Sequence, residues 1–245
     1  MKVIQFKNFS SKKPLKKNMF LLPNILTCMT LFLGCYAMIK AIDGAFAWAC
    51  TAVLLAMIFD FLDGRVARIT NTVSEFGEQF DSLADLVAFG CAPAFIALEY
   101  HLRDMQDFWV ALSFLWIGAV AVRLAKFNSQ KQEKNAFCGM PCPSAAALLV
   151  GYVGCHVESP VFFDSLSPSL MILVMLVGSF AMVCRIPFAN AKHLVLSKHC
   201  QYALLFLTLV LLSAMAIKPF LVLFLSSLSY LVVSIVSYVW SLRCR

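Results

Sequence analysis

The chain has 245 residues, of which 61% are hydrophobic and only 13% are charged. Soluble domains average about half hydrophobic and about a quarter charged residues, so this composition excludes a single water-soluble core. The net charge of +7 comes from a lysine-rich N-terminal tail and from short basic segments beside apolar stretches. This distribution favours anionic lipid headgroups, and not nucleic acid, as the electrostatic partner.

Apolar stretches of roughly 20 residues, long enough to cross a bilayer, recur along almost the whole chain. They predict an all-α polytopic bundle of eight transmembrane helices. After a basic segment over residues 1–20, the first six helices lie within residues 21–192, and two more lie within residues 193–245. The expected helices are Leu21–Lys40, Ala45–Ile69, Gly77–Tyr100, Phe108–Lys126, Pro143–Val157, Leu170–Ile186, Tyr202–Ile217 and Phe220–Leu242.

The positions of the basic residues predict the orientation. An even number of spans puts both termini on one side of the membrane. If that side is the cytoplasm, all 20 Lys and Arg residues except Lys40, Arg103 and Lys218 lie inside. The first apolar run is of full length and has no small-residue cleavage site after it, so we expect a retained helix and not a signal peptide.

The cysteines and histidines do not predict a site. The ten cysteines are scattered, mostly within predicted spans, and form no CxxC pair, so they are interpreted as apolar packing residues. The four histidines have no HxxxH or HExxH spacing, so the pattern does not indicate a histidine metal site.

Four aspartates fall at the cytoplasmic ends of the second and third predicted helices. Within each helix, the spacings i, i+3, i+7 and i, i+4, i+8 place acids and small residues on one face. The turn near residues 71–74 folds the two helices antiparallel, so that these faces meet. The pattern is Asp60-x-x-Asp63-Gly64-x-x-Ala67-Arg68, then eight residues, then Gly77-x-x-x-Asp81-x-x-x-Asp85.

Carboxylates at the hydrocarbon boundary are costly and repel one another, and a divalent cation removes both problems. Carboxylate oxygens suit Mg²⁺ or Mn²⁺, and four aspartates could hold two ions, the arrangement used for displacement at phosphorus. Gly64, Ala67 and Gly77 leave room for helix contact or for a flat ligand such as a nucleotide base. Arg68 could hold phosphate oxygens. Taken singly, the small residues and the arginine are more typical of helix packing and of topology.

The aspartate pattern resembles the signature of the CDP-alcohol phosphatidyltransferases, and every fixed position matches. The resemblance implies that Asp60, Asp63 and Asp81 hold one metal ion, that Asp81 and Asp85 share a second, and that Asp85 is the general base. It also implies a homodimer. Pro23-Asn24-x-x-Thr27 resembles the PNxxT element of the family. The implied CDP-lipid site comprises Asn24, Thr27, Gly64, Ala67, Arg68, Ser74 and Gly77.

Other runs resemble the serine branch of this family. The segments over residues 82–94, 123–128 and 139–143 are similar to membrane-integral phosphatidylserine synthases. This implies CDP-diacylglycerol and L-serine as substrates, in a bacterial inner membrane with the site facing the cytoplasm. The serine carboxylate would need a cation, and the candidates are Arg123, Lys126, Arg185 and Lys192, with Asn128 beside them and Arg123 ranked first. For each cation, an ordinary cytoplasmic-side residue is an equally good interpretation.

Alternatives stay open on the sequence. The same chemistry could use glycerol 3-phosphate or inositol as acceptor. Intramembrane acids could instead line the path of a divalent-cation transporter, although acids clustered near one interface fit an enzyme better. A non-catalytic protein that kept the motif is a third possibility. The HxK motif of the soluble serine synthases is absent.

Overall fold

A computed structural model describes residues 21–70, 72–101, 106–129, 139–158, 167–184 and 213–243, and these residues form helices and no strand. The all-α prediction is confirmed over this part of the chain. Of the predicted helices, Tyr202–Ile217 lies mostly outside the described residues. The elements are α1 (Leu21–Ile42), α2 (Phe46–Ile69), α3 (Glu75–Asp85), the π-helical turn η2 (Leu86–Cys91), α4 (Ala92–His101), α5 (Gln106–Ser129), α6 (Cys142–Glu158), α8 (Ser167–Val183) and α10 (Pro219–Arg243).

Several helices are suited to a bilayer by length and composition. Five described segments are long and apolar enough to cross a membrane, and α8 contains a shorter apolar stretch. The chain is therefore an integral membrane protein, while the total of eight spans and their orientation stay predictions. The five segments are Leu21–Ile42, Phe46–Ile69, Glu75–Tyr100, Trp109–Ser129 and Pro219–Tyr238.

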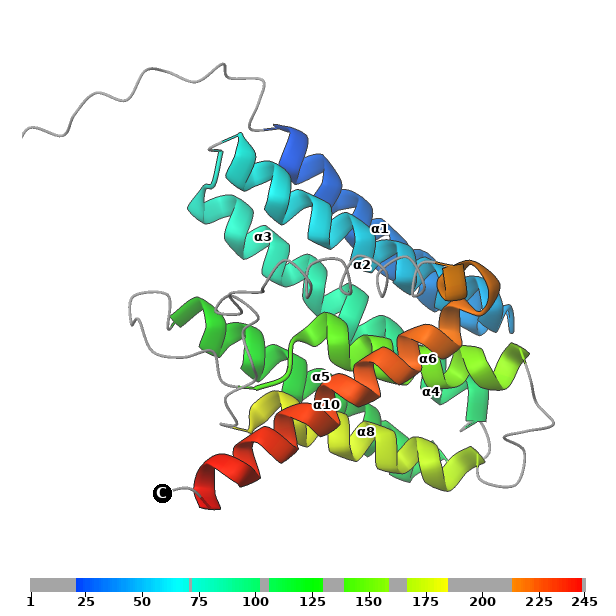
Figure 1. The fold of residues 1–245 in the computed structure, drawn as a ribbon. Coiled ribbons are helices and arrows are strands. Elements are labelled where there is room, and N and C mark those ends of the chain that lie inside the picture. The colour runs from blue at the N-terminus through cyan, green and yellow to red at the C-terminus, as the bar shows by residue number, and fades with distance from the viewer. Residues whose placement is uncertain are drawn as a thin grey trace, which may run out of the picture.

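Helix α6 lies in the middle of the bundle. Figure 1 shows α1, α2 and α3 on one side of it and α5 and α8 on the other, with α10 crossing it, and α6 contacts α2, α4, α8 and α10. Its residues from Ala145 to His156 are buried without interruption. A helix that is apolar on every face is expected where protein surrounds it. Burial by neighbouring helices therefore explains the apolar run that the sequence analysis assigned to the fifth span.

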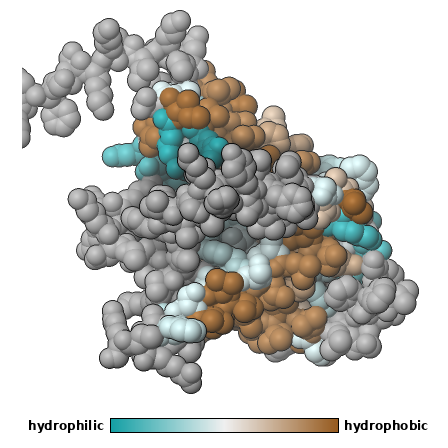
Figure 2. Space-filling model, viewed as in Figure 1, coloured by the Kyte–Doolittle hydropathy of each residue, from teal (hydrophilic) through white to brown (hydrophobic). Residues whose placement is uncertain are grey.

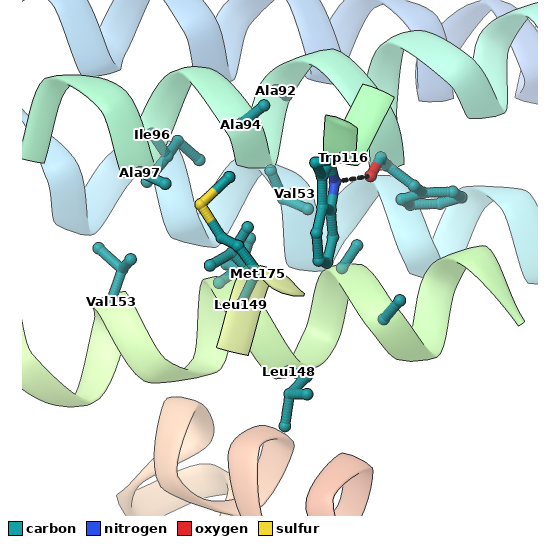
Figure 3. Packing of buried hydrophobic residues seen from close by; sticks show 14 of the residues in the cluster. Val53, Ala92, Ala94, Ile96, Ala97, Trp116, Leu148, Leu149, Val153 and Met175 are labelled. Carbon is teal, nitrogen blue, oxygen red and sulfur yellow. Dashed lines mark hydrogen bonds between the residues drawn. The ribbon is translucent and has the colours of Figure 1, made fainter. Parts of the chain in front are cut away.

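The third predicted helix contains an irregularity that the sequence analysis missed. A continuous helical segment runs from Glu75 to His101, and its π-helical turn begins directly after Asp85. The indole Nε1 of Trp116 donates a hydrogen bond of 3.2 Å to the Phe89 carbonyl within this turn (Figure 3). Gly34 of α1 allows close contact here, since a Cβ on it would lie 2.8 Å from Cα of Ala88. Turns of this kind often occur at functional sites.

The polar surface is concentrated at the ends of the bundle. Figure 2 shows hydrophilic side chains around the α2–α3 connection and, at the opposite end, near the α1–α2 connection, with mainly hydrophobic surface over α10. The four aspartates lie on α2 and α3, the two helices that this connection joins. The end of the bundle that includes this connection is called the site end below.

Candidate active site

The start of α3 is fixed by a side-chain cap. Ser74 has extended backbone geometry, and its Oγ accepts a hydrogen bond of 3.0 Å from the Gly77 backbone N–H. Such a cap satisfies one of the unpaired N–H groups at a helix start. The helix thus begins two residues earlier than predicted, at Glu75. It packs against α1, and it brings Asp81 and Asp85 close to the aspartates of α2.

Three of the four aspartates form a compact carboxylate cluster. One carboxylate oxygen from each of Asp60, Asp63 and Asp81 lies within 4.8 Å of the other two. Asp63 is the most buried of the three, with 4% of its surface exposed. Oxygen donors at this spacing can coordinate a single divalent cation, because Mg²⁺ and Mn²⁺ prefer carboxylate and phosphate oxygens. The donor set therefore fits a metal ion.

Asp85 lies beside this cluster and deeper in the bundle. Its carboxyl group is close enough to that of Asp60 to share a proton in a hydrogen bond. Oδ1 of Asp85 is buried and accepts no hydrogen bond from a donor of the described residues. A buried polar atom without a partner is costly and suggests a missing ligand or a catalytic role. Asp85 thus has one oxygen ready to accept a proton or to bind an ion.

A cavity of about 420 Å³ opens next to the carboxylate cluster, and we call it the nucleotide cavity. It lies between the start of α1, the end of α2 and the start of α3. All seven residues predicted for the CDP-lipid site line it, together with two of the aspartates. The lining residues are Pro23, Asn24, Thr27, Asp63, Gly64, Ala67, Arg68, Thr72, Val73, Ser74, Gly77, Glu78, Asp81, Ser82 and Phe127.

Several lining residues were not predicted. Phe127 enters from the end of α5, more than 40 positions after Asp85 in the sequence, and no motif marks it. Its position next to Lys126 in a run already singled out was the only available signal. Thr72 is buried and shares a hydrogen bond of 2.7 Å with Thr70 in the connection between the helices. Only the folded structure shows that these residues line the cavity.

The small residues and Arg68 keep this cavity open. A Cβ on Gly77 would lie 3.1 Å from Ser74 Oγ and 3.5 Å from Asn24 Oδ1, so a larger residue would fill space at the α1–α3 contact. Arg68 is exposed, and its Nε donates a hydrogen bond of 3.0 Å to the Gly64 carbonyl one turn earlier. This bond holds the guanidinium along the cavity wall, with its terminal nitrogens available to an anion.

The residues predicted to contact serine are in different surroundings. Arg123 is half-buried, and its Nη1 donates a hydrogen bond of 3.0 Å to Cys142 Sγ. Asn128 bridges α5 to α3, since its Nδ2 donates to Ser82 Oγ at 3.0 Å. Lys126 is exposed and points to the end of α8, with Nζ 3.5 Å from the Val183 carbonyl. Arg185 and Lys192 lie outside the described residues.

Arg123 is linked to the aspartates through Cys142. The Cys142 thiol that accepts its hydrogen bond is within electrostatic range of both Asp85 and Asp60. Within the described residues, Arg123 makes no salt bridge, and its Nε is buried without a hydrogen-bond partner. A guanidinium that is partly withdrawn from water normally pairs with an anion. An anionic group of a ligand would complete this environment.

Comparison with known proteins agrees with the geometry. The family model for CDP-alcohol phosphatidyltransferases matches residues 20–184, which include the four aspartates, the nucleotide cavity, Arg123 and Cys142. The chain belongs to this family. The match ends before α10, so the last described helix of this phosphatidyltransferase lies outside the region common to the family.

Similar proteins carry a more specific name. A Helicobacter pylori protein (strain ATCC 700392 / 26695) named CDP-diacylglycerol–serine O-phosphatidyltransferase is 36% identical over 203 residues, which cover 82% of this chain and 84% of the relative. A Mycobacterium leprae protein of the same name is 30% identical over 222 residues, covering 87% and 73%. One from Saccharomyces cerevisiae is 42% identical over 123 residues, covering 46% and 44%.

Proposed function

We propose that this phosphatidyltransferase moves a phosphatidyl group from CDP-diacylglycerol to L-serine, which yields phosphatidylserine and CMP. The observation that carries the proposal is the nucleotide cavity beside a cluster of three carboxylates whose oxygens lie within 4.8 Å of one another. The names of relatives that cover most of the chain favour serine over glycerol 3-phosphate and inositol.

The donor would bind with its cytidine end in the nucleotide cavity. The cavity extends from Asn24 and Gly77 to Arg68, which offers guanidinium N–H groups to phosphate oxygens. The diacylglycerol tails would lie along the exposed apolar side chains of the neighbouring helices, such as Phe61 and Phe76. This arrangement directs the diphosphate to the carboxylates.

The acids fit two divalent ions. Asp60, Asp63 and Asp81 would hold one Mg²⁺ or Mn²⁺, and Asp81 and Asp85 would share the second. Such ions, when bound, neutralise the charge of the diphosphate and of the leaving CMP. The protein contributes fixed oxygen donors on two helices, and the Thr27 hydroxyl holds Asp63 in position.

The chemical step needs a base, and Asp85 is the group we assign. The unpartnered Oδ1 of Asp85 would accept the proton of the serine hydroxyl. The serine oxygen then forms a bond to the phosphorus that carries diacylglycerol. The bond from this phosphorus to the bridging oxygen breaks, and CMP leaves with the electron pair. No covalent enzyme intermediate is involved.

The acceptor would be held from the other side of Asp85. Arg123 is half-buried with a buried, unpartnered Nε, and a serine carboxylate would supply the missing anion. Asn128 is hydrogen-bonded to Ser82 and supports the contact between α5 and α3. Arg123 is therefore our first choice for the carboxylate, ahead of the exposed Lys126.

The proposed location is a bacterial inner membrane, with the site end facing the cytoplasm. The basic residues Arg65, Arg68, Arg123 and Lys126 all lie in the half of the bundle nearer this end. The described helix ends fit eight spans, because α8 ends near Lys126 at the site end while α10 begins beside Glu158 at the opposite end. Both termini in the cytoplasm and a homodimer stay predictions.

One experiment distinguishes serine from the other acceptor alcohols, and an enzyme from a divalent-cation transporter. Purified protein with CDP-diacylglycerol and Mg²⁺ or Mn²⁺ is offered L-serine, inositol or glycerol 3-phosphate, and CMP and the lipid product are measured. We expect CMP and phosphatidylserine with L-serine only. A product from another acceptor would overturn the serine assignment. Divalent-ion uptake by proteoliposomes without CMP release would instead identify a transporter.

A further inference from the structure

Helix α10 is held tightly against α6 although it lies beyond the family match. Gly151 and Gly154 face it: a Cβ on Gly151 would lie 2.8 Å from the Phe224 backbone nitrogen, and one on Gly154 would collide with the Phe220 ring. Small residues that allow such an approach are typical of tight helix contacts in membranes. Nearer the site end, Ser227 Oγ donates a hydrogen bond of 2.6 Å to the Ser144 carbonyl.

The two helices run antiparallel, so the C-terminal half of α10 approaches the site. Lys218 pairs with Glu158 at 3.8 Å at the far end, and Ser227 meets Ser144 close to the start of α6. Tyr230 follows Ser227 by about one turn, which carries it past Ser144 to the level of Cys142. Its ring packs against the buried core, and its hydroxyl is within electrostatic range of Arg123.

Arg123 has neutral neighbours within the described part of the chain, the Cys142 thiol and the Tyr230 hydroxyl. Its side-chain hydrogen bond goes to the thiol, which is a weak acceptor, and no carboxylate of the described residues lies within salt-bridge distance. An arginine in a salt bridge with a protein carboxylate would have fewer N–H groups and less positive charge available to bind a ligand. A hydroxyl near the guanidinium can orient it without neutralising it.

We propose that α10 forms part of the acceptor site and that Tyr230 is a positioning residue, which orients Arg123 to receive the carboxylate of the acceptor. The proposal rests on the proposed function for the identity of that acceptor. In this proposal, α10, which lies outside the residues matched by the family model, helps the site to select an acceptor with a carboxylate, such as serine, over one without it, such as ethanolamine.

The test compares Tyr230→Phe with the matched variant Tyr238→Phe, which makes the same change two turns further along α10. Steady-state rates are measured for L-serine, for CDP-diacylglycerol and for ethanolamine, which has the hydroxyl and amine of serine but no carboxylate. We expect the KM for L-serine to rise roughly 3- to 10-fold in Tyr230→Phe, because the guanidinium loses one polar neighbour. The KM for CDP-diacylglycerol should stay unchanged, and the preference for serine over ethanolamine should fall by the same factor.

A second variant guards against a purely structural effect. Ser227→Ala loosens α10 from α6 without touching Arg123, and we expect a smaller shift of the serine KM in the same direction. An unchanged serine KM in Tyr230→Phe, or equal shifts of the KM for L-serine and for CDP-diacylglycerol, would overturn the role of Tyr230. The proposed function would still stand if the wild-type protein converts serine. A wild-type protein that forms no phosphatidylserine would overturn both.

Discussion

The Thr27 hydroxyl donates a hydrogen bond of 2.8 Å to Oδ2 of Asp63, and both residues are almost fully buried. This bond joins α1 to α2 at the point where the nucleotide cavity meets the carboxylate cluster. It fixes one oxygen of Asp63, so the other oxygen has a defined direction. Groups that orient a metal ligand in this way commonly alter metal affinity when they are removed.

Replacing Thr27 with Val should therefore weaken metal use. Val keeps the branched shape but cannot donate to Asp63, so we expect the Mg²⁺ or Mn²⁺ concentration for half-maximal activity to rise by roughly 10-fold or more. The measurement is a metal titration of CMP release. Thr27→Ser retains the hydroxyl and should titrate nearly as the wild type does. Equal titrations for Val and Ser would contradict a role for the hydrogen bond.

Asp85→Asn tests the proton acceptor. The amide has nearly the shape of the carboxyl group but cannot take the proton of the serine hydroxyl, so CMP release should fall by roughly 10²-fold or more. Folding is checked by gel filtration and thermal unfolding, and neither should change greatly because the buried Oδ1 has no hydrogen-bond partner in the described structure. Turnover close to that of the wild type would remove Asp85 from the role of base.

Gly77→Val tests the nucleotide cavity. The added methyl groups would extend from a Cβ that already lies 3.1 Å from Ser74 Oγ and 3.5 Å from Asn24 Oδ1. We expect a higher KM for CDP-diacylglycerol and an unchanged KM for the acceptor. Gly118→Ala on α5 is the control, since a Cβ there meets no atom within 4 Å. A donor KM that stays constant in Gly77→Val would contradict binding of the cytidine end in this cavity.

Trp116→Phe tests the π-helical turn next to Asp85. The change removes the hydrogen bond to the Phe89 carbonyl and leaves that buried group unsatisfied. We expect the free energy of unfolding to fall by about 1–3 kcal/mol, with a lower Tm. Trp48→Phe changes a tryptophan that is 65% exposed and should have little effect. Similar losses of Tm for the two variants would show that the indole bond does not stabilise the turn.

The sequence predicted much of this molecule because its strongest signals are local. Apolar length defines helices such as α1 and α2, and helical spacing puts Asp60 and Asp63 on one face. The π-helical turn after Asp85 was missed, since a shift of one residue in the backbone hydrogen bonds leaves the hydropathy pattern unchanged.

Residues that meet only through tertiary packing were harder to predict. Phe127 reaches the nucleotide cavity, and Tyr230 reaches the surroundings of Arg123, because helices far apart in the sequence are neighbours in the bundle. Composition and spacing contain no information on such contacts. The ranking of Arg123 above Lys126 came from a resemblance, and the burial of Arg123 beside Cys142 gives it a physical reason.

The most direct test of the central claim follows isotope-labelled L-serine and CMP together in the purified protein with CDP-diacylglycerol and Mg²⁺ or Mn²⁺. The account predicts that labelled phosphatidylserine and CMP appear in equal amounts, and that both are lost in Asp85→Asn. CMP release without incorporation of labelled serine into lipid, or incorporation that persists in Asp85→Asn, would contradict it.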